Sequence, residues 1–103
     1  MTFVVVVEEQ AAQDITAYAE WMVSQGSPLN AARWMDGIED AMASLSTMPE
    51  RCGHAPESET LGGGIRQLIF KSHRILFVVE DARVHVLHIR HGARGPYSPD
   101  EPQ

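Results

Sequence analysis

The fold of this chain is decided by residues 65–94, which read IRQLIFKSHRILFVVEDARVHVLHIRHGAR. The stretch holds three runs rich in β-branched and aromatic residues, at 65–70, 74–79 and 84–90. The connections between these runs are only a few residues long, which is typical of hairpins. We therefore expect three consecutive antiparallel strands, with the unbroken apolar run 75–79 in the central strand.

The N-terminal half supplies the remaining elements. Residues 3–7, FVVVV, form a continuous β-branched run, which predicts a strand buried on both faces or paired inside the sheet. Apolar residues then take helical spacing from about 9 to 25, and a second amphipathic helix follows Ser27-Pro28, a favoured N-cap and first-turn pair. The order β-α-α-β-β-β predicts an α+β fold, a helical hairpin packed on a small, mostly antiparallel sheet.

Length and composition allow one domain with one modest core, because the chain has 103 residues and is 44% hydrophobic. We expect residues 1–94 to form this single domain and residues 95–103, GPYSPDEPQ, to be an irregular, flexible tail. The connection 49–64, which is rich in glycine and proline, should be a long irregular loop in which His54 is solvated.

Several classes of protein and site are disfavoured. Cys52 has no second cysteine to pair with, so we interpret it as an incidental thiol in a reducing cytosol. No signal peptide is recognisable, and no run approaches the roughly 18 apolar residues of a membrane span. His85, His88 and His91 would be scattered by strand alternation, so we expect no metal site and no cofactor, in a soluble cytoplasmic protein.

Charge is distributed unevenly along the chain. Residues 65–94 hold six basic and two acidic side chains, whereas residues 1–64 hold ten acids and two arginines, and the whole chain carries a net charge of −6. Such asymmetry concerns the partners of a protein rather than its fold. One face of the sheet could therefore meet an anion while the rest of the surface repels it.

Strand alternation sorts the candidate residues of the last strand into two sets, Val86, His88 and Arg90 on one face and His85, Leu87, Ile89 and His91 on the other. Arg66 and Arg74 belong to neighbouring strands, and we expect them to lie close together across the sheet edge. Clustered arginines can bind phosphate or carboxylate groups bidentately. The cluster Arg66, Arg74, Arg90 and His91 is thus either an anion-binding surface or a set of solvated residues and structural ion pairs.

Two motifs are distinctive, HRILFVV at 73–79 and IRHGAR at 89–94. They follow a series of shorter features in a fixed order: the first strand running into Ala12, Asp14 and Ile15; AAR at 31–33 with Ile38 and Leu45; Met48-Pro49 with Gly53; and GIR at 64–66. Over residues 3–94, this order resembles the RelE/ParE superfamily of type II toxins, and more closely its ParE, or plasmid-stabilisation, branch.

The resemblance implies a growth-inhibiting toxin that is neutralised by an antitoxin encoded beside it. The antitoxin would cross the sheet and helical hairpin as an extended or helical segment, in a complex that could be a heterotetramer, and the toxin could also form a homodimer. RelE-like members cut mRNA on the ribosome, whereas ParE-like members poison DNA gyrase. For a nuclease, the resemblance implies catalytic roles for Arg74, Arg90 and His91, with Tyr97 in place of a C-terminal catalytic tyrosine. The candidate target-binding residues are Arg66, Arg74, Arg90, His91 and Arg94.

The charge of the chain favours the gyrase branch. A ribosome-dependent nuclease needs many basic groups, but this chain has a single lysine, Lys71, and an acidic total. We also find no clear general base, since Glu57 and Glu59 are expected to be solvated loop residues. We predict a non-enzymatic ParE-like toxin; the alternatives are a RelE-like endoribonuclease and a degenerate member that retains only antitoxin binding.

Overall fold

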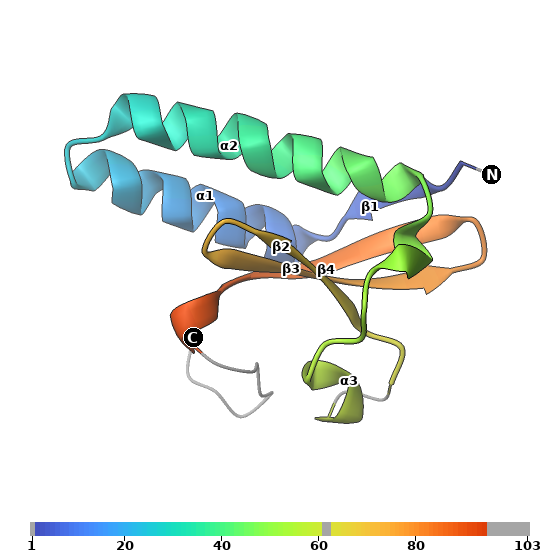
Figure 1. The fold of residues 1–103 in the computed structure, drawn as a ribbon. Coiled ribbons are helices and arrows are strands. Elements are labelled where there is room, and N and C mark those ends of the chain that lie inside the picture. Colours follow the sequence, from blue (N-terminus) through green and yellow to red (C-terminus); the bar gives the residue numbers. More distant parts are fainter. Residues whose placement is uncertain (1, 61–62, 95–103) are drawn as a thin grey trace.

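Two helices cover one face of a four-stranded sheet, and a short third helix lies on the other side (Figure 1). The computed structural model describes residues 2–60 and 63–94, apart from the side chains of Thr60 and Arg94. The strands are β1 (Val4–Val7), β2 (Arg66–Phe70), β3 (His73–Glu80) and β4 (Arg83–His91), and the helices are α1 (Glu9–Ser24), α2 (Pro28–Ala43) and α3 (Glu57–Thr60). Single 3₁₀ turns lie at Ser44–Ser46, Pro49–Arg51 and Gly92–Arg94.

The strand order in the sheet is β1-β4-β3-β2, with antiparallel pairing in β2–β3 and β3–β4 and parallel pairing in β1–β4. This confirms the expected order of elements and the central position of β3. The prediction for the first strand was wrong, because within the described residues β1 is an edge strand whose one neighbour in the sheet is β4. Val4 and Val7 are exposed there. A run of valines indicates a strand, but it does not say whether a second neighbour is present.

The helical hairpin forms as its apolar spacing predicts. Helix α1 buries Ala11, Ile15 and Ala19, and the buried residues of α2 follow the same helical period: Ala31, Trp34, Ile38 and Met42. Gly26 joins the helices with a φ of 82°, in the left-handed region that glycine adopts without strain. The expected side-chain cap from Ser27 does not form, although Pro28 does occupy the first helical turn.

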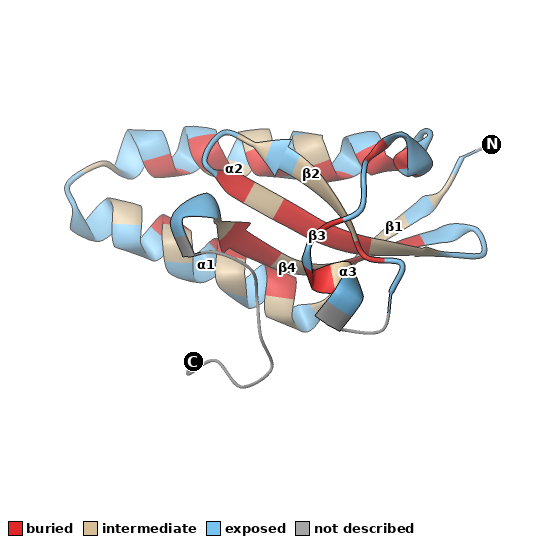
Figure 2. Ribbon diagram, turned by 60° about the horizontal axis from the view of Figure 1, so that its bottom comes forward, coloured by how far each residue is buried: buried red, intermediate tan, exposed pale blue. Residues whose placement is uncertain are grey.

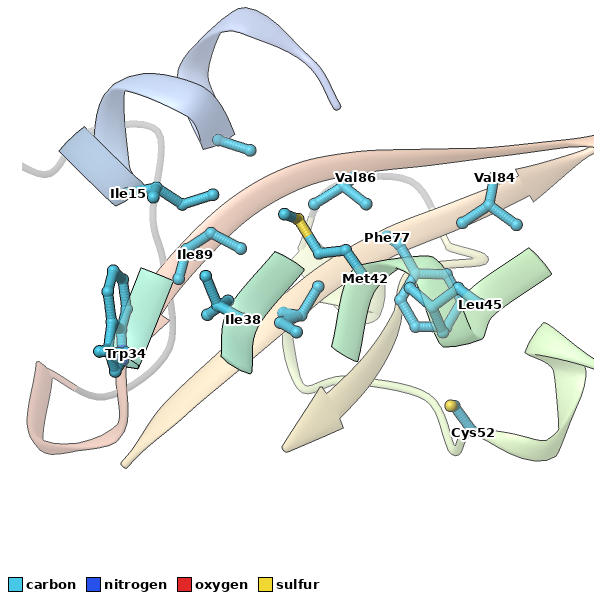
Figure 3. Packing of buried hydrophobic residues seen from close by; sticks show 12 residues of the cluster. Ile15, Trp34, Ile38, Met42, Leu45, Cys52, Phe77, Val84, Val86 and Ile89 are labelled. Atoms are coloured by element: carbon cyan, nitrogen blue, oxygen red, sulfur yellow. The ribbon is translucent and has the colours of Figure 1, made fainter. Parts of the chain in front are cut away.

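The main core lies between this hairpin and the covered face of β3 and β4 (Figure 3). The fully buried Ile38 and Leu45 come from the helical side, and Phe77 and Val86 come from the sheet. Helix α2 also approaches β2 closely, because a Cβ added to Gly37 would lie 2.5 Å from the Phe70 ring. The absence of a side chain at this position is therefore what lets the helix and the edge strand meet.

One extra residue in β4 overturns the expected sorting of side chains. Leu76 pairs with His88 but the next residue of β3, Phe77, pairs with Val86, so Leu87 is inserted as a β-bulge. Strict alternation holds on each side of the bulge and fails across it. As a result, the helix-covered face carries Val84, Val86, Ile89 and His91, and the opposite face carries His85, Leu87, His88 and Arg90.

The segment between α2 and β2 covers part of this opposite face. The backbone N–H of Ala55 donates to the Ile65 carbonyl, and that of Gln67 donates to the Gly53 carbonyl, so the segment folds back along β2. A second, smaller core forms beneath it from Ala55, Ile65 and Leu76. Figure 2 shows α3 lying over the sheet on this side. The sequence prediction of an irregular loop missed both α3 and this core.

None of the helices in residues 2–60 and 63–94 is long and apolar enough to span a membrane. The tail predicted for residues 95–103 lies outside the described residues.

We expect Ile38→Ala to lower the free energy of unfolding by about 2–5 kcal/mol, because Ile38 is 0% exposed at the centre of the main core. Leu29→Ala removes a side chain of similar size from the same helix, where it is 61% exposed, and should change stability by less than about 0.5 kcal/mol. Urea unfolding of both variants measures the difference. Equal losses would contradict the assigned packing.

Candidate functional site

Arg74, the central candidate of the sequence, makes a bidentate ion pair with Glu57. One guanidinium nitrogen of Arg74 lies 2.9 Å from Oε1 of Glu57 and the other lies 2.7 Å from Oε2, while Gln67 Oε1 accepts a further hydrogen bond at 3.0 Å. The Glu57 side chain is 0% exposed and that of Arg74 is 13% exposed. The two charges are thus removed together from water, in a geometry that satisfies the planar guanidinium.

The prediction that Glu57 is solvated was therefore wrong. Helix α3 places Glu57 over the open face of the sheet, directly above β3. An ionised carboxylate remains buried only when an opposite charge and hydrogen-bond donors lie beside it. The Arg74 guanidinium supplies both the positive charge and the two donors. The sequence could not predict this ion pair from local patterns. Arg74 and Glu57 are 17 residues apart, and Glu57 lies in a segment rich in glycine and proline.

We had expected Arg66 to lie close to Arg74 across the sheet edge, and this prediction was wrong. Arg66 pairs with Phe77 in the sheet, whereas Arg74 pairs with Ile69, so the two arginines project from opposite faces. The Arg66 guanidinium instead donates to the backbone carbonyls of Cys52 at 2.6 Å and Glu50 at 3.3 Å. Its observed role is to fasten the segment before α3 to the edge strand.

The remaining candidates are also divided between the two faces. Arg90 is the direct cross-strand partner of Arg74 and is buried on the open face. His91 pairs with His73 on the helix-covered face, and its Nδ1 accepts a hydrogen bond from the Ala93 N–H at 3.1 Å. The side chain of Arg94, and the whole of Tyr97, lie outside the described residues. The structure thus brings together only Arg74 and Arg90 of the predicted set.

An aromatic and imidazole cluster lies on the helix-covered face of the sheet, at the same end as Arg74 and Arg90, between α1, α2 and the paired ends of β3 and β4. The His73 ring packs edge-on to Tyr18, with ring centroids 4.2 Å apart, and edge-on to His91, at 4.9 Å. Trp34 packs against both Tyr18 and His73. Burial, assisted by the nearby His91 imidazole, lowers the pKa of His73 to about 4, so this ring is neutral at pH 7.

Two carboxylates contact β4, one from Glu8 immediately before α1 and one from Asp14 within this helix. Asp14 accepts hydrogen bonds from the Ile89 backbone N–H at 3.0 Å and from the Gln10 amide at 2.9 Å, and His88 lies 3.8 Å away. Burial alone would raise the pKa of Asp14, but the hydrogen bonds from His88, Ile89 and Gln10 outweigh it and hold that pKa below its ordinary value.

Glu8 lies 2.8 Å from His85 in a second carboxylate–imidazole contact on β4. The Asp14 contacts attach α1 to β4 beyond the end of β1, whereas Glu8 contacts β4 at His85, which lies opposite Val6 of β1. Among the described residues, no group of three His, Cys, Asp or Glu side chains is placed to hold a metal ion.

We expect Glu57→Gln to lower the free energy of unfolding by about 3–5 kcal/mol, because the change leaves the Arg74 charge buried without its carboxylate. The neighbouring Glu59→Gln makes the same chemical change at an exposed position, and we expect it to shift stability by less than about 0.5 kcal/mol. Urea unfolding at neutral pH compares the two variants. If Glu57→Gln were as stable as Glu59→Gln, the pair would have no structural role.

We also expect acid to weaken the fold through His73. The pKa of His73 is lower in the folded chain than its ordinary value of 6.5, so the unfolded chain binds more protons between these two pKa values. Stability should be complete above pH 6.5 and should fall as the pH approaches about 4, by up to about 1.4 kcal/mol per pH unit for this one group. Asp14 adds its own loss only below its ordinary pKa of 3.8.

Urea unfolding at about pH 7 and about pH 4.5 measures this dependence. The variant His73→Phe keeps an aromatic ring but cannot be protonated, so it should lose less stability on acidification than the unmodified chain. The exposed His54→Phe should retain the original dependence. An unchanged acid response in His73→Phe would refute the assignment.

Two solved structures show the same fold as this chain. A chromosomal ParDE toxin–antitoxin structure from P. aeruginosa is 18% identical, with a TM-score of 0.75, and the match covers 87% of this chain and 96% of the other. The RelBE2 toxin–antitoxin complex from Mycobacterium tuberculosis is 22% identical, with a TM-score of 0.58, and the match covers 88% and 99%. At these identities the likeness concerns the fold alone. A search of curated protein sequences finds no match.

The family comparison is more specific than the structural one. The model of the ParE toxin of type II toxin–antitoxin systems matches residues 5–96, which include all three α-helices and all four strands apart from Val4, the first residue of β1. The predicted resemblance is thereby confirmed at the level of the family. This chain belongs to the ParE toxin family of type II toxin–antitoxin systems.

Proposed function

We propose that this chain is a growth-inhibiting toxin that acts by binding DNA gyrase and is neutralised by a cognate antitoxin. The observation that carries the choice of target is the ion pair between Arg74 and the fully buried Glu57. A nuclease of the RelE type would need Arg74 available to stabilise the charge that develops on phosphate during cleavage. Here the guanidinium already holds a carboxylate in its bidentate position, which supports action through protein contacts.

The placement of the other basic residues gives the same indication. Arg66 lies on the face opposite Arg74 and donates to backbone carbonyls, and Arg90 is buried. His91 projects from a different face than Arg90 does. Together with the net charge of −6, this arrangement offers no continuous basic surface along which the described part of the chain could hold RNA phosphates.

An antitoxin has an apolar surface to bind on the helical hairpin. A groove of about 440 Å³ runs between α1 and α2, lined mainly by Ala19, Val23, Ala31, Ala32 and Met35. Such a groove accommodates the apolar face of an amphipathic helix. We also propose that the toxin–antitoxin complex is a heterotetramer, or that the toxin forms a homodimer.

Expression of the chain alone in a bacterial host should arrest growth, and the purified chain should inhibit supercoiling of relaxed plasmid by gyrase. Co-expression of the antitoxin encoded beside it should restore growth. The variant His91→Gln, which removes an imidazole that the nuclease alternative assigns to catalysis, should remain toxic.

The nuclease alternative gives a different result in the same experiment. Growth arrest with normal supercoiling, together with mRNA cut within codons on the ribosome, would overturn the gyrase proposal. Loss of both activities in a chain that still binds the antitoxin would identify a degenerate member.

A further inference from the structure

Trp21 is an exposed aromatic residue that neither core requires. It lies near the end of α1, with 54% of its surface accessible, and is absent from both buried clusters. Its ring lies 5.4 Å from that of Tyr18, with an angle of 31° between the ring planes. Tryptophan is enriched at the energetic centres of protein interfaces, where its large face is covered by a partner. Its exposure here therefore points to a contact outside the chain.

A cavity of about 250 Å³ opens beside this ring, lined by Asp14, Ala17, Tyr18, Trp21, His73, Ile89 and His91. Three properties of the lining limit what it can bind. Aromatic and imidazole rings make up most of the wall, one carboxylate contributes the only acidic group, and no lysine or arginine is among these residues. The cavity is thus neither a plain apolar pocket nor an anion site.

The charge at the cavity is negative. The hydrogen bonds to Asp14 hold the pKa of this carboxyl below its ordinary value, so it is ionised at neutral pH, and the His73 ring is neutral there. The chain itself supplies three hydrogen bonds to Asp14, from Gln10, His88 and Ile89, and a carboxylate can accept about four. Helix α1 also carries Glu9 and Glu20 and no basic residue, so the helix as a whole is acidic, although neither of these two side chains lines the cavity.

An arginine side chain satisfies these features better than a lysine or an apolar group. Its planar guanidinium stacks on aromatic faces and also donates in-plane hydrogen bonds to a carboxylate, whereas the ammonium of lysine is a compact and strongly hydrated point charge. Tyr18 and Trp21 offer ring faces, and Asp14 offers the acceptor. We infer that this cavity receives an arginine side chain of the antitoxin, stacked against Trp21 and paired with Asp14.

This inference rests on the proposed antitoxin partner and adds a specific contact to it. The cavity lies across α1 from the apolar groove, whose α1 residues are Thr16, Ala19, Glu20 and Val23. An antitoxin segment bound along the hairpin could therefore fill the groove with apolar side chains and place one arginine at the end of the sheet. Charge complementarity with the acidic α1 would also speed the encounter of the two chains.

The first test uses a small probe and the purified chain, without antitoxin or gyrase. N-acetyl-arginine amide should shift the indole N–H signal of Trp21 in a saturable titration followed by NMR, and should leave that of the buried Trp34 unchanged. N-acetyl-citrulline amide has the same shape without the charge, and we expect it to bind at least about fivefold more weakly. Equal responses to the two probes would overturn the inference.

The second test measures antitoxin affinity by calorimetry. Trp21→Ala should weaken binding by about fivefold to thirtyfold, the range expected for a desolvated cation–π contact. Asp14→Asn should also weaken it, since the amide oxygen can still accept from Ile89 but the charge is lost. Asp40→Asn makes the same chemical change at an exposed position of α2 that lines neither the cavity nor the groove, and this matched control should retain affinity to within about twofold.

The outcomes separate this contact from the function as a whole. Full antitoxin affinity in Trp21→Ala, with a folded chain by circular dichroism, would overturn the contact while leaving the toxin–antitoxin function intact. Absence of any antitoxin binding by the unmodified chain would refute the proposed partner, and with it the occupant of the cavity. Because Trp21 is exposed and lies outside both cores, its replacement should not disturb the fold on which either measurement depends.

Discussion

The pairing register between β3 and β4 is the constraint on which the two faces of this protein depend. The single inserted residue, Leu87, shifts the alternation of β4 between Val86 and His88. Because side chains alternate with a period of two, a one-residue shift exchanges the face of every later residue in the strand. The bulge therefore places Ile89 in the main core and Arg90 beside Arg74, which uninterrupted alternation from Val86 would reverse.

The same register explains why the positive charge of residues 65–94 does not form one surface. It sets Arg74 directly opposite Arg90, two like charges whose proximity is unfavourable unless an anion lies near them. Glu57, carried by α3, supplies that anion to Arg74, and its own side chain is fully buried there. Arg74 of the sheet thus holds α3 on the open face through its ion pair with Glu57. Arg66 contributes to the same end from the other face, through the carbonyls of Glu50 and Cys52.

The sequence predicted the fold better than it predicted the site, and the reason is physical. Helical spacing around Ile15 and Ile38, and the apolar run of β3, are periodic signals that many residues share, so a single exception does not obscure them. The candidate site depends instead on single structural features, each of which involves only one or two residues. The bulge at Leu87 changes no composition, and the partnership of Glu57 with Arg74 joins residues that are far apart in the chain. A valine run likewise indicates a strand at 4–7 without showing that it lies at the sheet edge.

The distribution of charge bears directly on what the two faces of this protein can bind. The two solved structures that share this fold are a ParDE and a RelBE system, so the fold alone does not select a target. What can differ is whether the arginines of the sheet are directed at a ligand or at the protein itself. In this chain the buried carboxylate of Glu57 pairs with Arg74. On α1, by contrast, Glu20 and Trp21 are exposed. An acidic and aromatic surface favours basic side chains of a protein partner over nucleic-acid phosphates. We therefore expect a partner protein to bind first at the helical hairpin and not at the arginine-bearing face of the sheet.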